Sequence, residues 1–280
     1  MPRDQILTFF SKYIESELGM VYSENNDFQL QNRLEEIVKL HNFANIQELY
    51  EVAQKGMIGS LKQLVLDVAT NNETSFFRDT KYFNAFRNLI EQQMKGDLFP
   101  QKELKIWSAA SSTGQEALSI SILIDELKKK HNSSLPYSIL GTDISERALT
   151  KAREAKYRQL EVQRGLTTAQ MIQYFTKDDK DMWEASKELT KHIQFKKMNL
   201  RDDNYPYNGF HFIFCRNVLI YQSVENKIKI LNKLESCLVP GGFLILGVGE
   251  SLIGLDQDYE TVMMDNAVIY RKKHQILKVA

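Results

Sequence analysis

The sequence has few cysteine, proline and glycine residues. Its 280 residues include two cysteines, five prolines and 13 glycines, whereas 43% are hydrophobic and 26% are charged. This composition excludes a disordered chain and is typical of a soluble globular protein with two ordinary domains, or with one large α/β unit and an appendage. Cys215 and Cys237 have neither metal-ligand nor redox-motif spacing, so we predict that both are buried free thiols.

The sequence also has no net charge and no long apolar run. The 36 lysines and arginines balance the 36 aspartates and glutamates, which leaves no overall field to attract nucleic acid or an anionic membrane. No segment approaches the roughly 20 apolar residues of a membrane span. The N-terminal "MPRDQILTFFSKY" carries charges where a signal peptide is apolar. We therefore expect a cytoplasmic protein with no nucleic-acid partner and no direct membrane insertion.

Two kinds of pattern follow one another along the chain. Up to about residue 70, apolar residues recur at helical spacing between short polar turns, and Gly19 supplies a stop for the first helix. This pattern predicts a small helical N-terminal domain over residues 1–75. A further amphipathic stretch predicts a linker helix over residues 76–100.

From Leu104 onward, short apolar runs alternate with helical segments. The runs are "LKIWSAA", "YSILGTDI", "IQFKKMNL", "FHFIFCRNVLIY", "GGFLILG" and "AVIYRKK". This alternation is typical of parallel strands joined by crossover helices, and the late "AVIYRK" indicates an antiparallel last strand. We therefore predict an α/β domain over residues 101–280, with a small insert at about residues 170–195.

Polar residues stand where the predicted strands end. In a doubly wound sheet, ligands bind beyond the carboxyl ends of the strands, near the switch in strand order. The residues in these places are, in chain order, Glu116, Asp143, Asn199, Arg216 and Asn217. The loop before Glu116 has one glycine and no lysine, so it is neither a dinucleotide fingerprint nor a P-loop. The acid at its exit favours a ligand with hydroxyl groups or a positive charge.

Each of these strand ends also has a simpler interpretation. Glu116 follows a tight turn whose serine and threonine residues can cap a helix, and either Asp143 or Ser145 can cap the helix that starts at Glu146. Asn199 fits a plain turn. Arg216 fits a structural salt bridge, because a buried cation without a partner costs several kcal/mol.

Taken together, six stretches resemble one known family. They are "NNETSFFRD" (71–79), "IWSAASSTGQEALSIS" (106–121), "GTDISERALTKAREAKY" (141–157), "QFKKMNL" (194–200), "FIFCRNVLIY" (212–221) and "LVPGGFLILGVGES" (238–251). In this order and at these intervals the sequence is similar to the CheR-type chemotaxis receptor methyltransferases, the protein-glutamate O-methyltransferases of bacteria. The resemblance covers essentially the whole chain.

The resemblance implies a fold, a cofactor and a set of site residues. The fold would be a class I, Rossmann-like methyltransferase domain that binds S-adenosylmethionine, preceded by a small all-α domain. The family's cofactor contacts fall on Asn72, Thr74, Arg78, Glu116, Asp143, Asn199, Leu200, Arg216 and Asn217. Arg78 and Tyr221 are the candidate catalytic residues, and no metal is expected. After Tyr221 the family pattern has phenylalanine where this sequence has Gln222, a change that we expect to alter packing more than chemistry.

The implied reaction needs no general base. A glutamate side chain, with a reference pKa of about 4.3, is already ionised at neutral pH, so catalysis should depend on proximity and alignment. The implied partner is the cytoplasmic domain of a methyl-accepting chemotaxis receptor, and we expect a monomer. Because "TKDDKDMWEASKELTKHIQF" is short and has no glycine, we predict that tethering to a receptor-tail peptide is absent or weak.

Two other functions are alternatives. A sensor or adaptor could bind S-adenosylmethionine without transferring methyl, although intact Arg78, Arg216, Asn217 and Tyr221 argue against it. An NAD-dependent oxidoreductase is disfavoured by the missing glycine fingerprint.

Overall fold

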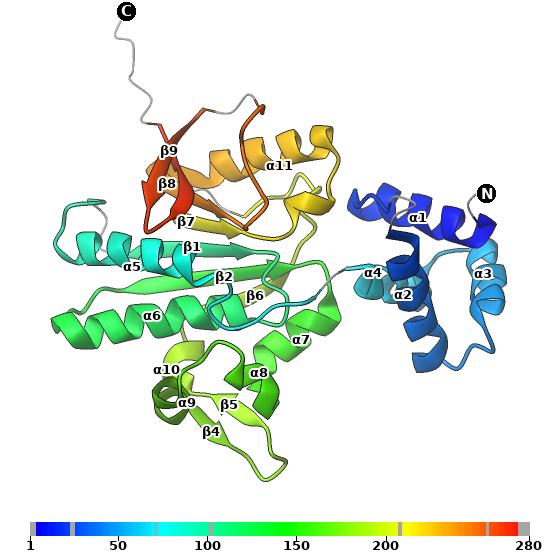
Figure 1. Ribbon diagram of the computed structural model, residues 1–280, viewed down its shortest axis with the longest axis horizontal. Coiled ribbons are helices and arrows are strands. Elements are labelled where there is room, and N and C mark those ends of the chain that lie inside the picture. The colour runs from blue at the N-terminus through cyan, green and yellow to red at the C-terminus, as the bar shows by residue number, and fades with distance from the viewer. Residues whose placement is uncertain are drawn as a thin grey trace, which may run out of the picture.

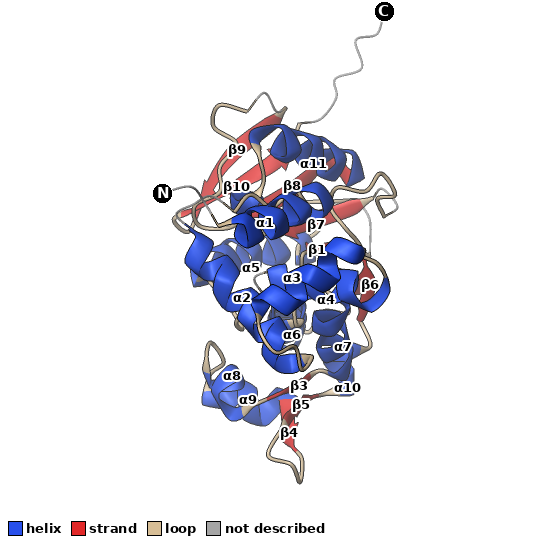
Figure 2. Cartoon of the chain, turned by 90° about the vertical axis from the view of Figure 1, so that its right-hand side faces the viewer, coloured by secondary structure: helices blue, strands red, loops and turns tan. Residues whose placement is uncertain are grey.

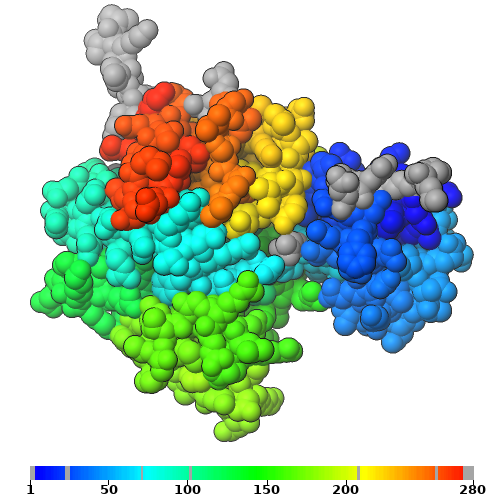
Figure 3. All heavy atoms as spheres, in the orientation of Figure 1, coloured from blue at the N-terminus to red at the C-terminus, as the bar shows by residue number. Residues whose placement is uncertain are grey.

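The computed structural model describes residues 4–22, 26–70, 72–100, 103–206, 209–255 and 258–273. The first helices are α1 (Gln5–Leu18), α2 (Asp27–Leu40), α3 (Ile46–Lys55) and α4 (Gly59–Ala69). Figure 1 shows them together at one end of the molecule, and in the space-filling view of Figure 3 they adjoin the rest of the chain along one side. Their apolar stripes meet in one core cluster that includes Phe10, Leu30, Leu49 and Val65. The helical spacing in the sequence thus corresponds to real buried faces.

Residues that border α1 explain where it begins and ends. The Asp4 carboxylate accepts a hydrogen bond from the N–H of Ile6 at 2.7 Å, which satisfies one free donor of the first turn. At the other end Gly19 has a φ of +69°, and its N–H donates to the carbonyl of Glu15 at 2.8 Å. Side chains rarely tolerate this φ, so the stop predicted at Gly19 is confirmed.

A seven-stranded sheet in the order β6-β2-β1-β7-β8-β10-β9 forms the centre of the molecule. The strands are β1 (Leu104–Ala109), β2 (Tyr137–Asp143), β6 (Ile193–Lys197), β7 (Phe210–Cys215), β8 (Leu238–Leu246), β9 (Tyr259–Met264) and β10 (Ala267–Lys272). Neighbours from β6 to β8 are parallel, whereas β10 is antiparallel to both β8 and β9. The predicted α/β class, with a mostly parallel sheet and an antiparallel last strand, is confirmed. Strand β9 was not predicted, because it lies at the sheet edge and only one of its six residues is buried.

Helices cover both faces of this sheet. On one face, α5 (Thr80–Met94) and α6 (Gln115–His131) pack over an aromatic core. There the ring of Phe86 meets Phe212 and Phe214 edge-on, with centroids 5.0 and 5.2 Å away. On the other face, α11 (Val224–Cys237) covers a second cluster that contains both cysteines. Cys215 and Cys237 are buried and free, as predicted.

A small antiparallel sheet lies beside α6, away from α11 (Figure 2). Its strands, in the order β3-β5-β4, are β3 (Lys156–Tyr157), β5 (Trp183–Ala185) and β4 (Phe175–Lys177). The short helices around it are α8 (Gln159–Gln163), α9 (Thr168–Tyr174) and α10 (Lys187–Thr190), and α7 (Glu146–Glu154) precedes it. The sheet begins at Lys156, ahead of the predicted insert at 170–195, because β3 comes from an earlier segment. The division of the chain into domains stays a prediction.

The turn between β4 and β5 forms without glycine. The Asp178 carboxylate accepts hydrogen bonds from the N–H groups of Lys180 and Met182, at 2.9 and 3.0 Å. Asp181 takes the left-handed conformation, with a φ of +60°, which aspartate tolerates better than most residues. The missing glycine therefore does not prevent an antiparallel insert.

Candidate active site

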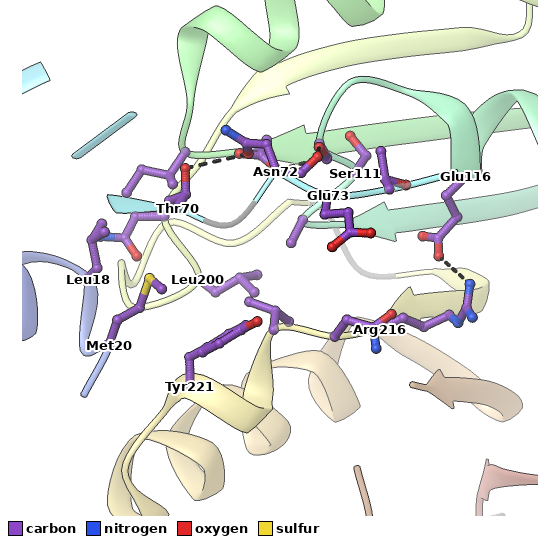
Figure 4. A pocket seen from close by; sticks show the side chains of 18 of the residues that line it. Leu18, Met20, Thr70, Asn72, Glu73, Ser111, Glu116, Leu200, Arg216 and Tyr221 are labelled. Atoms are coloured by element: carbon purple, nitrogen blue, oxygen red, sulfur yellow. Dashed lines mark hydrogen bonds and ion pairs between the residues drawn. The ribbon is translucent and has the colours of Figure 1, made fainter. Parts of the chain in front are cut away.

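A cavity lies where the carboxyl ends of β1, β2, β6 and β7 face the end of α1 (Figure 4). It holds about 980 Å³ of empty space, its open mouth included. Strand order reverses here, since β2 and β6 lie on one side of β1 and β7 on the other. This is the place at which a doubly wound sheet binds its ligand.

The cavity brings together every site residue that the sequence predicted. All ten line it, and they are Asn72, Thr74, Arg78, Glu116, Asp143, Asn199, Leu200, Arg216, Asn217 and Tyr221. Their roles toward a cofactor or an acceptor stay predictions. Their common location shows that strand ends far apart in the sequence meet at one place.

Asp143 connects the first two strand ends. Its carboxylate accepts hydrogen bonds from the N–H of Ser112 at 2.8 Å and from the N–H of Ser145 at 2.9 Å. Of the two candidate helix caps, Ser145 is the cap, and its hydroxyl accepts a hydrogen bond from the N–H of Ala148. Burial raises the pKa of the Asp143 carboxyl, and the backbone hydrogen bonds oppose that rise.

Backbone strain gathers around the cavity. The left-handed conformation, with φ between +47° and +64°, occurs at five non-glycine residues here: Phe77, Asp79, Ala110, Ser112 and Asn217. Such conformations cost free energy and tend to persist at functional sites, where the surrounding structure enforces them. The loops that line the cavity are therefore shaped by their tertiary contacts.

Arg216 forms a buried ion-pair network, the alternative that the sequence left open for it. Its side chain is 2% exposed and bonds to the carboxylates of Glu116, at 3.0 Å, and Asp79, at 2.9 Å. It also donates to the carbonyl of Arg78 at 2.7 Å and lies over the ring of Tyr82. Glu116 has a second partner, the hydroxyl of Ser108, at 2.7 Å. Arg216 thus joins the end of β7 to the starts of α5 and α6, and its charge is balanced within the protein.

The segment before α5 closes another side of the cavity. The Ser112 hydroxyl donates to the carbonyl of Asn72 at 2.9 Å, and the Arg78 guanidinium donates to the carbonyl of Glu73 at 2.7 Å. Phe76 is 1% exposed and is buried against Tyr157 of the small sheet. This aromatic anchor holds the segment that carries Asn72, Thr74 and Arg78 in place.

The end of α1 supplies a wall that the sequence did not predict. Leu18 and Met20 line the cavity. The Asn199 amide donates to the carbonyl of Glu17 at 3.0 Å, and the Gln222 amide donates to the carbonyl of Leu18 at 3.1 Å. These side chains satisfy carbonyls that have no partner within the helix. A helix end has no local signal for such a role, because its partners lie about two hundred residues away.

The run "FHFIFCRNVLIY" is not one strand. Strand β7 ends at Cys215, and the chain then turns through Asn217 into the short 3₁₀ helix η2 (Leu219–Tyr221). This turn directs Asn217 and Tyr221 to the cavity. Figure 4 shows Tyr221 and Arg216 across the cavity from Asn72, Glu73 and Ser111.

Polar atoms without partners test whether a polar cofactor fits. Among the described residues, five buried side-chain atoms have no hydrogen-bond partner, and three of them belong to residues that line the cavity: Ser111 Oγ, Arg216 Nε and Gln222 Oε1. Buried polar groups are normally paired, so their concentration here indicates a ligand with hydrogen-bonding groups. Leu18, Met20 and Leu200 add apolar surface. A nucleoside cofactor has both kinds of surface and fits this lining.

No helix in the described part of the chain is both long and apolar enough to cross a membrane.

Comparisons with known proteins agree on one family. Residues 72–268 match the family model described as "CheR methyltransferase, SAM binding domain". The chain is 35% identical over 271 residues to a chemotaxis protein methyltransferase of Vibrio parahaemolyticus, covering 96% of this chain and 98% of the relative. It is 34% identical over 267 residues to chemotaxis protein methyltransferase Cher2 of Pseudomonas putida, covering 94% and 96%. It is also 34% identical over 266 residues to chemotaxis protein methyltransferase 1 of Pseudomonas aeruginosa, covering 94% and 96%.

Proposed function

Because the chain belongs to the CheR methyltransferase family, we propose that it methylates glutamate carboxylates in the cytoplasmic helices of chemotaxis receptors. The resemblance that the motifs indicated is confirmed. The matched model describes a SAM binding domain, so the cofactor is S-adenosylmethionine and its product S-adenosylhomocysteine. The glutamate acceptor and the receptor partner are the proposed part.

The acceptor assignment rests on a difference in ion pairing between two arginines in the cavity. Arg216 is balanced by Asp79 and Glu116. By contrast, no carboxylate of the described residues lies within ion-pair distance of Arg78, whose guanidinium bonds to a neutral carbonyl. An arginine with an uncompensated charge favours an anionic group beside it. We assign that place to the acceptor carboxylate or to the carboxylate of the cofactor.

The remaining lining suggests how the cofactor would be held. S-adenosylmethionine supplies the methyl group, which is bonded to a sulfonium. Asp143 and Glu116 would hold the ribose and the amino-acid end of the cofactor, and Leu200, beside Asn199, would border the adenine. Arg216, which pairs with Glu116, would order that carboxylate without touching the methyl group. This arrangement agrees with Asp143 at the tip of β2, where an acid binds ribose hydroxyls in related folds.

The chain's own residues would act by alignment and exclusion of water. A glutamate acceptor is ionised at neutral pH, so no residue has to remove a proton before transfer. Arg78 and Tyr221, which line the cavity from separate segments, would fix the carboxylate in line with the methyl group. Alignment of this kind supplies about 7–11 kcal/mol in well-oriented systems. Charge is neutralised during transfer, so the apolar wall of Leu18 and Met20 also favours the reaction.

Methyl transfer to receptor fragments tests the proposal. Purified protein is incubated with S-adenosylmethionine labelled in its methyl group and a panel of receptor cytoplasmic fragments. We expect label on the fragments that mild base releases, as an ester requires. The matched control replaces the labelled glutamates by glutamine, and label should then be lost. Label that resists base, or no label on any fragment, would contradict the glutamate assignment.

The sensor or adaptor without methyl transfer is not favoured, since the relatives are methyltransferases by name. We further propose that the protein is a monomer and that it binds a receptor-tail peptide weakly or not at all. The second point rests on the sequence alone, because the stretch at residues 176–195 is short and contains no glycine. Calorimetry with a tail peptide tests it, and saturable binding would overturn it.

A further inference from the structure

Glu250 lies outside the cavity lining, yet it contacts the backbone that carries two of the cavity's side chains. It follows β8 in the turn that begins at Gly247. Strands β7 and β8 are parallel neighbours, and Cys215 pairs with Leu246 at their carboxyl ends. The turn after β8 is thereby placed beside the turn after β7, from which Asn217 and Tyr221 reach the cavity.

The Glu250 carboxylate accepts hydrogen bonds from five backbone N–H groups. One oxygen, Oε2, accepts from Gly247 at 2.7 Å and from Asn217 at 2.8 Å. The other, Oε1, accepts from three successive residues, which are Val218 at 2.9 Å, Leu219 at 2.7 Å and Ile220 at 3.3 Å. A carboxylate offers about four lone-pair sites, so this one is saturated.

The four donors from Asn217 to Ile220 precede or begin η2 (Leu219–Tyr221). The N–H groups at the start of a helix lack an intrahelical acceptor, and η2 is only three residues long. Asn217 in addition holds a left-handed conformation, with a φ of +59°. The conformation from Asn217 to Ile220 therefore depends on a charge that comes from another turn, 30 to 33 residues later.

Gly247 is required for this close approach. A Cβ atom at this position would lie 2.8 Å from the backbone nitrogen of Asn217 and 2.8 Å from Glu250 Oε2. Contacts under about 3 Å do not occur between such atoms, so any side chain would push the two turns apart. The sequence "GVGE" thus combines a glycine that permits the contact with an acid that makes it.

We propose that Glu250 is a positioning residue for methyl transfer, acting through Asn217 on the cofactor and through Tyr221 on the acceptor. The role of Glu250 toward the acceptor rests on the proposed function. Its role toward the cofactor does not, because binding of S-adenosylhomocysteine can be measured without any acceptor.

A double-mutant cycle on cofactor binding is the first test. Glu250→Gln keeps the size of the side chain, but its amide nitrogen cannot accept hydrogen bonds, so at least two of the five N–H groups lose their acceptor. We expect S-adenosylhomocysteine to bind about tenfold more weakly, measured by calorimetry. In an Asn217→Ala background, Glu250→Gln should weaken binding of S-adenosylhomocysteine by less than about twofold, because the Asn217 side chain that Glu250 positions is absent. A cost that stays tenfold in that background would overturn the proposal.

Turnover gives the second test and separates the two proposals. We expect Glu250→Gln to lower kcat about 100-fold, the usual effect of a misplacement of about 1 Å, and to cost much less in a Tyr221→Phe background. Normal kcat and normal cofactor affinity in Glu250→Gln would overturn the positioning role. If the wild type binds S-adenosylhomocysteine but methylates no glutamate, the proposed function fails, and the binding cycle still decides the role of Glu250.

Matched variants guard against a simple folding defect. Glu48→Gln is the control, because Glu48 also accepts a backbone N–H, that of Ala44, but lies at the start of α3 and does not line the cavity. It should leave binding and turnover unchanged. If Glu250→Gln does not fold, Gly247→Ala disturbs the same contact from the other turn, and it should also weaken binding of S-adenosylhomocysteine and lower kcat. Normal binding and normal kcat in that variant would contradict the inference.

Discussion

The buried charge of Arg216 leads to a quantitative prediction for Arg216→Ala. The side chain is 2% exposed and is paired with Asp79 and Glu116 at 2.9 and 3.0 Å. Its removal leaves Glu116, whose side chain is 11% exposed, with Ser108 as its remaining partner in this network. Loss of one partner of a buried pair typically costs about 3–5 kcal/mol, because the other charge stays buried. We therefore expect the free energy of unfolding to fall by about 3–5 kcal/mol.

Urea unfolding followed by circular dichroism measures this change, and Arg87→Ala is the matched control. Arg87 pairs with Glu126 at the same 3.0 Å, but its side chain is 36% exposed, and surface pairs contribute only about 0–1 kcal/mol. A double variant, Arg216→Met with Glu116→Gln, removes both charges of the more buried pair and leaves Asp79, whose side chain is 28% exposed. It should recover part of the lost stability relative to Arg216→Met alone. The reasoning is refuted if Arg216→Ala costs no more than Arg87→Ala, or if neutralising Glu116 recovers nothing.

Three further predictions concern the cavity. Burial raises the pKa of the Asp143 carboxyl. The affinity for S-adenosylhomocysteine should therefore be full above that raised pKa, and on acidification it should begin to fall at a higher pH than it would for an ordinary aspartate, whose pKa is about 3.9. Calorimetry over a pH series checks this, and Asp143→Asn, which does not titrate, should show no such fall. Arg78→Ala should reduce turnover by about 100-fold and cofactor affinity by less than about threefold; wild-type activity in the methyl-transfer assay would exclude its role. Gly19→Ala should lower the melting temperature more than Gly59→Ala. Both glycines have a positive φ, but only at Gly19 would a Cβ atom contact the Gln222 side chain, at 2.4 Å. Equal losses in the two variants would contradict this contact.

Most of the fold could be predicted from the sequence, because its evidence is local. Helical spacing of apolar residues identified the N-terminal helices, and Gly19 marked the end of α1. Short apolar runs identified six of the seven strands of the central sheet. Strand β9 was missed, because an exposed edge strand carries little apolar signal. The 3₁₀ turn inside "FHFIFCRNVLIY" was not distinguished from a strand for the opposite reason, since its residues are as apolar as those of β7.

The candidate site was predicted as a set of residues but not as a network of contacts. The position of each polar residue after a strand was enough to predict that Asp143, Asn199 and Asn217 would share a cavity, because parallel strands end at one edge of a sheet. Which groups touch was not predictable. Asn199 donates to the end of α1, 182 residues earlier, and nothing in its own neighbourhood indicates that partner.

The sequence by itself determined most of the order of helices and strands, the family and the polar residues of the site, since periodicity, turn residues and motif spacing are properties of short segments. Only the tertiary structure decided what the charges do. Arg216 pairs with Glu116 and Asp79, which lie 100 and 137 residues earlier in the sequence. The Glu250 carboxylate accepts a hydrogen bond from the N–H of Asn217, which lies 33 residues earlier. These contacts exist because sheet pairing brings distant strand ends together, and a buried charge must then be satisfied by whichever groups that packing places around it.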